Sequence, residues 1–157
     1  INIVAVGRST PYLDEVVGYA EANGISHLIH IRHGVNYDDL PVFYKLATAF
    51  VYPSRIEGFG IPMLEAITSG LPAIGCTGSC LEEAGGPTSL YVNPDDVEGM
   101  ADAIHSVYND VTLRQNMIAQ GKEYARRFDI AKLTSDLYEV YKTVCGSHRG
   151  LGPNSLL

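Results

Sequence analysis

Short apolar runs alternate with longer stretches of helical periodicity over the first 92 residues of the chain. The apolar runs are bounded by Gly and Pro and predict strands, whereas apolar positions spaced three or four residues apart predict helices. Strands are expected at residues 1–7, 27–33, 48–53, 71–76 and 89–92, and helices between them at 12–23, 38–46 and 61–69. This alternation predicts an α/β fold with a Rossmann-like parallel β-sheet sandwiched by helices, in which the strand at 1–7 is buried.

Beyond Pro94 the pattern predicts only helices, at 97–109, 111–127 and 130–145. Asp95 and Asp96 are both suitable N-caps for the first of them. The last twelve residues, GSHRGLGPNSLL, contain Gly, Pro and Ser with weak periodicity and are expected to form a tail. The predicted organisation is therefore one domain over residues 1–145 and a tail over 146–157.

The helix expected at 130–145 has an apolar stripe at helical spacing. The stripe consists of Leu133, Leu137, Val140, Tyr141 and Val144. We expect it to pack against the sheet of its own domain. The alternative is a stripe that remains exposed on this chain.

Composition narrows the class of function. A chain of 157 residues with 46% apolar and 18% charged residues is typical of one globular domain. A net charge of −7 without a Lys/Arg cluster argues against a nucleic-acid surface. No apolar run approaches the 18 or more residues that span a bilayer. The chain opens without Met, directly in an expected strand, which predicts a fragment of a longer protein.

The three cysteines, Cys76, Cys80 and Cys145, are an odd number in a chain that is large enough to fold without disulfides. Reduced thiols in a cytoplasmic protein are expected instead. No further Cys or His completes a ligand set at zinc-like spacing, so we expect no metal site.

The segment Tyr52 to Gly70, YPSRIEGFGIPMLEAITSG, follows an expected strand and opens an expected helix. Open parallel sheets bind ligands at such positions. Gly58 and Gly60 let the backbone approach a ligand closely, and the helix N-terminus suits a diphosphate. Gly-rich turns of this kind also occur in α/β proteins without a phosphate ligand.

Two carboxylates belong to this segment, Glu57 in the loop and Glu65 about one turn inside the helix. Carboxylates only accept hydrogen bonds, so they suit hydroxyl groups better than phosphates. A ligand with hydroxyls at both ends of a phosphate bridge fits this pair. For Glu65 alone, interaction with the helix dipole is the alternative.

EGFGIPMLEA, with its Glu-x7-Glu spacing, resembles the signature of family 4 of the retaining GT-B glycosyltransferases, the glycosyl transferases group 1. Three further stretches are also similar to that family. They are VGRSTPYLDEV, the residues leading to the motif, and SGLPAIGCTGSCLEEAGG after it. The resemblance covers nearly the whole chain. It implies the C-terminal, donor-binding domain of a GT-B fold, truncated at its N-terminus.

The resemblance also implies roles for individual residues. Glu57, the implied catalytic residue, would contact hydroxyls of the transferred sugar, and Glu65 would bind the ribose. Backbone N–H groups of Gly58, Phe59 and Gly60 would face the distal phosphate and the sugar. At the base, Val35 would offer main-chain hydrogen bonds and Arg8 would lie nearby. For Arg8, a solvated loop residue is the alternative.

Two features of the family have no counterpart here. The Arg and Lys that neutralise the leaving diphosphate, spaced Arg-x5-Lys, are not found. We also expect the N-terminal acceptor domain to be missing, together with its Gly-rich loop and cleft histidine. His27, His30 and His33 lie along one expected strand and look structural, although His33 is near enough to the strand's end to line the site.

For the full-length protein the resemblance implies transfer of a hexose from a nucleoside-diphosphate sugar, with retention of configuration, in polysaccharide biosynthesis. The family requires no metal or cofactor. We expect the fragment alone to be inactive, and any peripheral membrane association to come from the missing half. The alternatives are a sugar-nucleotide epimerase of GT-B architecture and a non-catalytic nucleotide-binding or interaction domain. A receiver module would need an acidic cluster after the first strand, which INIVAVGR lacks.

Overall fold

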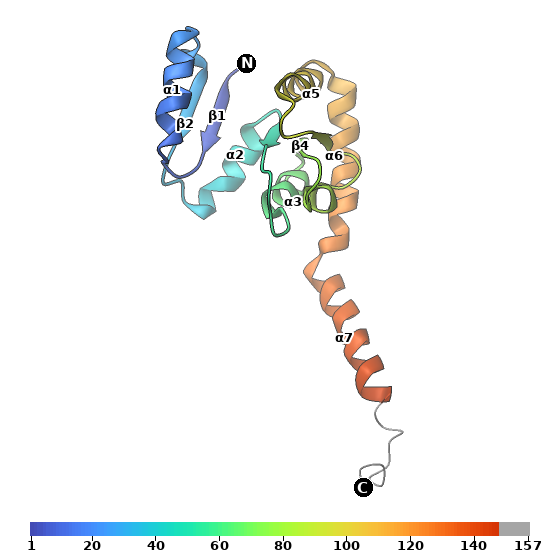
Figure 1. The fold of residues 1–157 in the computed structure, drawn as a ribbon. Helices are drawn as coiled ribbons and strands as arrows, with labels where there is room; N and C mark the ends of the chain where they lie inside the picture. Colours follow the sequence, from blue (N-terminus) through green and yellow to red (C-terminus); the bar gives the residue numbers. More distant parts are fainter. Residues whose placement is uncertain (148–157) are drawn as a thin grey trace. The chain divides into compact units, whose positions relative to one another are not determined.

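The computed structural model describes residues 1–147 and the side chains as far as Cys145. These residues form two compact units, which meet in sequence between Phe43 and Tyr44. Unit 1 contains β1 (Ile3–Val6), α1 (Tyr12–Ala22), a 3-10 turn (Ser26–Leu28), β2 (Ile29–Arg32) and a second 3-10 turn (Tyr37–Asp39). Helix α2 (Leu40–Leu46) spans the boundary between the units (Figure 1).

Unit 2 contains the remaining strands and helices. In chain order these are β3 (Phe50–Tyr52), α3 (Ile61–Thr68), β4 (Ala73–Cys76), α4 (Leu81–Gly85), β5 (Leu90–Val92), α5 (Val97–Asn109), α6 (Val111–Ala125), a 3-10 turn (Arg126–Phe128) and α7 (Ile130–Ser147). The strands pair in parallel in both units, β1 with β2 and β3-β4-β5 with β4 in the centre.

The predicted order of strands and helices is confirmed, and so is the Rossmann-like α/β class with parallel strands flanked by helices. Hydrogen bonding divides the strands into two sheets instead of one. Sequence reasoning missed α4, because five residues are too few to show helical periodicity. Of the two expected caps for α5, Asp96 is the N-cap, and its carboxylate accepts from the N–H of Gly99 at 2.8 Å.

The prediction that the first strand is buried is wrong for this chain. All four residues of β1 are exposed, and Ile3 keeps 53% of its surface accessible. Among the described residues, β1 pairs with β2 alone, so its apolar side chains lack the cover that a buried parallel strand has.

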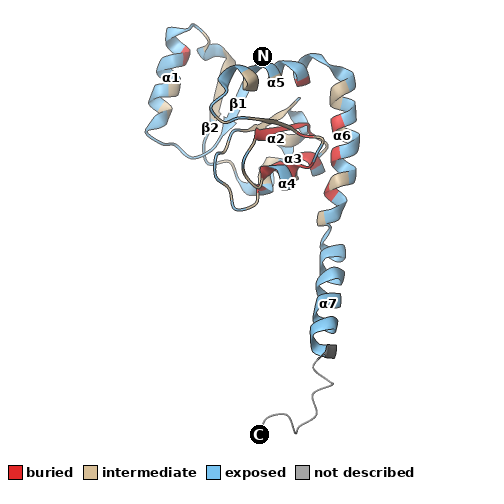
Figure 2. Ribbon diagram, turned by 45° about the vertical axis from the view of Figure 1, so that its right-hand side comes forward, coloured by how far each residue is buried: buried red, intermediate tan, exposed pale blue. Residues whose placement is uncertain are grey.

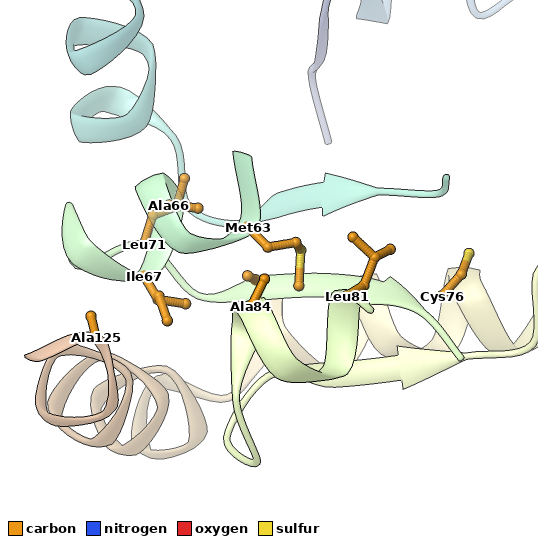
Figure 3. Close-up of a cluster of buried hydrophobic side chains, with 9 residues drawn as sticks. Met63, Ala66, Ile67, Leu71, Cys76, Leu81, Ala84 and Ala125 are labelled. Carbon is orange, nitrogen blue, oxygen red and sulfur yellow. The ribbon is translucent and has the colours of Figure 1, made fainter. Parts of the chain in front are cut away.

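The core of unit 2 lies between α3, α4 and the β3-β4-β5 sheet. Met63 of α3 and Leu81 of α4 are fully buried there, beside Cys76 of β4 (Figure 3). A Cβ atom added to Gly75 or Gly85 would lie 3.1 Å or 2.7 Å from the Met63 Cε atom. The Met63 side chain therefore occupies space that these two glycines leave open.

A second cluster joins the sheet to the last helices of unit 2. Ile74 of β4, Val107 of α5 and Met117 of α6 are its buried members. Helix α5 packs against β5 and α6, whereas α6 also packs against α3 and contributes Ala125 to the cluster around Met63. Helices therefore flank the sheet, as expected from the sequence.

The apolar stripe of α7 does not pack against the sheet, so that interpretation is wrong. Figure 2 shows α7 exposed over residues 130–145, and Leu137 and Val144 keep 53% and 55% of their surfaces accessible. Helix α7 contacts the preceding 3-10 turn, but it diverges from the core where α6 ends. Residues 146 and 147, the first two of the predicted tail, belong to α7, and the rest of the tail predicted at 146–157 lies outside the described residues.

Gly60 is the N-cap of α3 and adopts a left-handed φ of 99°. A Cβ atom at this position would lie 2.7 Å from Leu81 Cδ2 and 3.2 Å from Ala84 Cβ. Gly60 therefore allows both the turn into α3 and the close approach of α4. Gly58 shows neither requirement, since its φ is not positive and an added Cβ meets no atom within 4 Å.

We predict that Met63→Ala lowers the free energy of unfolding by about 2–5 kcal/mol, because it leaves a cavity between α3, β4 and α4. Met63→Leu nearly conserves volume and should cost less than about 1.5 kcal/mol. Urea denaturation of both variants measures the difference. Equal losses would contradict the packing described for Met63.

We also predict that Gly60→Ala destabilises the chain by about 1–3 kcal/mol, since alanine is strained at this φ. The clash with Leu81 acts in the same direction. Gly58→Ala is the matched control and should stay within about 0.5 kcal/mol of the wild type. Thermal unfolding of the two variants tests this, and a Gly58→Ala variant as unstable as Gly60→Ala would refute it.

Candidate functional site

The candidate site is built on the loop between β3 and α3, where the carboxyl end of a parallel strand leads into a helix. Glu57, Gly58 and Phe59 lie in this loop, Gly60 caps the helix and Glu65 lies within it. The loop also meets the turn before α4, since the Cys80 thiol donates to the Glu57 carbonyl oxygen at 3.1 Å. The five motif residues predicted from the sequence are therefore brought together in unit 2.

The start of α3 has no side-chain cap. The N–H groups of Met63 and Leu64 both bond to the Gly60 carbonyl oxygen, and Pro62 has no N–H. Within residues 1–147, the N–H groups of Gly58, Phe59 and Gly60 donate to no protein acceptor. Such amides beside a helix N-terminus can bind an anion.

The Phe59 side chain packs inside the protein and does not take part in this anion site. Its ring packs edge-on against Phe128 at a centroid distance of 5.5 Å and joins the core cluster around Met63. Phe59 therefore anchors the loop through its side chain, so only its backbone is available to a ligand.

Glu57 accepts a hydrogen bond from the Tyr52 hydroxyl at 2.7 Å. This bond, and a smaller contribution from the Ser54 hydroxyl, hold the pKa of the Glu57 carboxyl below its usual value. Burial, with the same bond and the nearby negative charge, raises the pKa of Tyr52 to about 12. At neutral pH the pair is therefore a phenol that donates and a carboxylate that accepts.

Glu65 is half-buried on α3 and accepts a hydrogen bond from the Tyr44 hydroxyl of α2 at 3.0 Å. This tertiary partner comes from another helix, so interaction with the dipole of α3 does not account for the position of Glu65 by itself. Both motif carboxylates therefore accept from a tyrosine hydroxyl.

Arg55, the cation within the loop, is engaged with Asp95 at 2.6 Å and also reaches the Pro94 carbonyl oxygen at 3.4 Å. The ion pair raises the pKa of Arg55 and lowers that of Asp95. Both side chains are largely exposed, so the pair contributes little to stability. It connects the loop to the segment between β5 and α5.

Arg8 and Val35 belong to unit 1, where they follow β1 and β2 at the carboxyl edge of that sheet. His33 bonds to the Gly7 carbonyl oxygen through Nδ1 at 2.9 Å, and Gly34 has a φ of 66°. His33 thus connects the two loops that contain Arg8 and Val35. Their roles toward a nucleotide base remain predictions.

Sequence reasoning missed Tyr44, Tyr52, Arg55 and Cys80. Tyr52 lies five residues before Glu57, but no motif marked it. Asp95 is 40 residues from Arg55, and Tyr44 is 21 residues from Glu65. Contacts over such separations leave no signal in a single sequence.

No group of three or more His, Cys, Asp or Glu side chains that could hold a metal ion occurs in the described part of the chain. In the same residues, no helix is both long and apolar enough to cross a membrane.

Comparison with known proteins places this chain in a family. Residues 1–124 match the family model of glycosyl transferases group 1. The O-antigen chain mannosyltransferase RfbU of Salmonella typhimurium is 36% identical over 128 residues, which cover 82% of this chain and 35% of RfbU. The chain thus spans about a third of the length of this curated relative.

Solved structures agree on the fold. The C-terminal domain of LpcC, a glycosyl transferase group 1 protein of Francisella tularensis, superposes with a TM-score of 0.72 at 22% identity, covering 82% of this chain and 70% of that one. Anabaena HepE in complex with UDP superposes with a TM-score of 0.82 at 16% identity, covering 91% of this chain and 41% of HepE. HepE has also been solved with UDP-glucose. The motif EGFGIPMLE thus lies in a matching fold and within the matched residues, and the chain belongs to the family of glycosyl transferases group 1.

Proposed function

We propose that this chain is the donor-binding domain of a retaining glycosyltransferase, which transfers a hexose from a nucleoside-diphosphate sugar to an acceptor. The observation that carries the proposal is the pair of carboxylates, Glu57 and Glu65, on either side of a helix start that has no side-chain cap. Membership in the family and the mannosyltransferase relative support sugar transfer, with mannose as the first hexose to test.

In this proposal the amides of Gly58, Phe59 and Gly60 face the distal phosphate, where their N–H groups stabilise negative charge. Glu57 accepts from hydroxyls of the transferred sugar, and Glu65 accepts from the ribose. For Arg8 and Val35 of unit 1, we keep the roles near the base that the family resemblance implies. The UDP and UDP-glucose complexes of HepE, which has a similar fold, support a nucleotide-sugar ligand.

The chemistry would depend on positioning of the donor and on stabilisation of the departing diphosphate. We propose that neither a metal nor a cofactor takes part. Among the described residues, Arg55 is the cation of the β3–α3 loop, and it is already paired with Asp95. We therefore expect little or no transfer by the 157-residue chain alone. Full activity would need an acceptor-binding domain and further cations.

We also propose that the protein works in polysaccharide biosynthesis in the cytoplasm. RfbU is named an O-antigen chain mannosyltransferase, which supports a role in polysaccharide biosynthesis. The cysteines Cys76, Cys80 and Cys145 are free thiols, which supports a cytoplasmic location.

Calorimetric titration of the chain with UDP, GDP and ADP tests the proposed ligand. We expect one of the three to bind, and Glu65→Ala to weaken its binding about tenfold, because a charge-assisted hydrogen bond is lost. Glu139→Ala, an exposed carboxylate on α7 that pairs with Lys142, is the matched control and should bind like the wild type.

Failure of all three nucleotides to bind at millimolar concentration would refute the donor site and leave only the fold and the family membership established. Binding that is unaffected by Glu65→Ala would favour a nucleotide-binding domain with a different contact to the ribose. Efficient sugar transfer by the 157-residue chain would contradict the expected inactivity.

A further inference from the structure

We propose that Tyr52 and Tyr44 are positioning residues, each for one carboxylate of the donor site. Tyr52 orients Glu57 toward the transferred sugar, and Tyr44 orients Glu65 toward the ribose. The assignment rests on the proposed function, because that function states which part of the donor each glutamate binds. The two contacts themselves are features of unit 2.

Tyr52 is the last residue of β3, and its hydroxyl reaches Glu57 Oε1 at 2.7 Å across the start of the loop. Glu57 is also held from a second element, since the Cys80 thiol donates to its carbonyl oxygen at 3.1 Å. One bond fixes the carboxylate and the other fixes the backbone. Together they limit the rotamers of a glutamate that would otherwise be free on a loop.

Tyr44 reaches Glu65 from α2, at 3.0 Å from its hydroxyl to Oε2. Glu65 projects from a helix whose neighbouring residues Met63, Ala66 and Ile67 are buried. The backbone of Glu65 is therefore fixed by packing, and the Tyr44 hydroxyl adds a constraint on the end of its side chain.

The two tyrosines belong to one aromatic cluster, which consists of Tyr44, Phe50 and Tyr52. The Phe50 ring lies edge-on to Tyr44 at 5.5 Å and parallel to Tyr52 at 5.7 Å. All three rings are half-buried and pack against the core cluster around Met63. The rings of Tyr44 and Tyr52 are therefore held by packing, so their hydroxyl groups have fixed positions.

Fixed donors prepare the carboxylates for a polyhydroxylated ligand. An ionised carboxylate has about four acceptor positions, so a bond to one tyrosine hydroxyl leaves capacity for ligand hydroxyls. A side chain that is already oriented loses less conformational entropy when the ligand binds. Because the two glutamates would read different ends of the donor, loss of each tyrosine hydroxyl should weaken a different part of the binding.

The test compares Tyr52→Phe and Tyr44→Phe by calorimetry, with UDP-glucose against UDP and GDP-mannose against GDP. Tyr52→Phe should weaken binding of the sugar nucleotide about three- to tenfold and change binding of the free nucleotide less than about twofold. Tyr44→Phe should weaken both by a similar factor. Tyr124→Phe, whose hydroxyl donates to the Glu83 carbonyl oxygen at 2.7 Å, is the matched control and should change neither.

A second measurement needs no ligand. The carboxyl carbon of Glu57, followed by NMR, reports its pKa in the apo protein. The hydrogen bond from Tyr52 is the largest cause of the lowered Glu57 pKa, and the Ser54 hydroxyl is the second. Of the other polar groups near the loop, the Cys80 thiol donates to the Glu57 backbone, and Arg55 is paired with Asp95. Tyr52→Phe should therefore move the Glu57 midpoint to higher pH, whereas Tyr44→Phe and Tyr124→Phe should leave it unchanged.

The outcomes separate the two proposals. If the wild type binds none of the four nucleotides, the proposed function fails. If the Glu57 midpoint does not move in Tyr52→Phe, the positioning role fails, whether or not a ligand binds. Equal losses for sugar nucleotide and free nucleotide in Tyr52→Phe would overturn the assignment of Glu57 to the sugar. A merely structural role of Tyr52 would lower the unfolding temperature without this split.

Discussion

The contact between Gly60 and Leu81 is the constraint on which the site depends. Because Gly60 has no side chain, α4 can approach the start of α3 closely, and the chain can turn from the loop into the helix with a left-handed φ. The same approach leaves Leu81 fully buried and fixes the turn that contains Cys80, which holds the Glu57 backbone. One missing Cβ atom therefore links the core of unit 2 to the geometry of the loop.

Much of the fold could be predicted from the sequence, because local signals marked it. Pro62 and Gly70 bound α3 closely, and α5 covers the predicted 97–109 without change. The segment from Glu57 to Glu65 was predictable as a site because its glycines and carboxylates lie together in sequence. The two wrong predictions concern burial, which depends on neighbouring elements. Whether β1 and the stripe of α7 are buried is decided by what packs on them, and periodicity shows only that an apolar face exists.

The partners of the two glutamates could not be predicted for a similar reason. Tyr44 approaches Glu65 only because α2 and α3 both pack beside β3, and such an arrangement is a property of the folded chain. The partner of Arg55 is equally distant in sequence, since the segment after β5 brings Asp95, 40 residues away, within 2.6 Å. Spacing along the chain identified the two carboxylates of the candidate site, but not the side chains that form hydrogen bonds to them or the carboxylate that pairs with Arg55.

The pairing of Arg55 has a consequence for how quickly a ligand arrives. With Arg55 engaged by Asp95 and Glu57 ionised, the loop offers a diphosphate backbone amides but no unpaired cationic side chain, and the whole chain has a net charge of −7. An anionic ligand would then approach this chain against electrostatic repulsion. Added salt screens such repulsion, so the association rate would rise with ionic strength, opposite to the behaviour of a site that attracts anions from a distance.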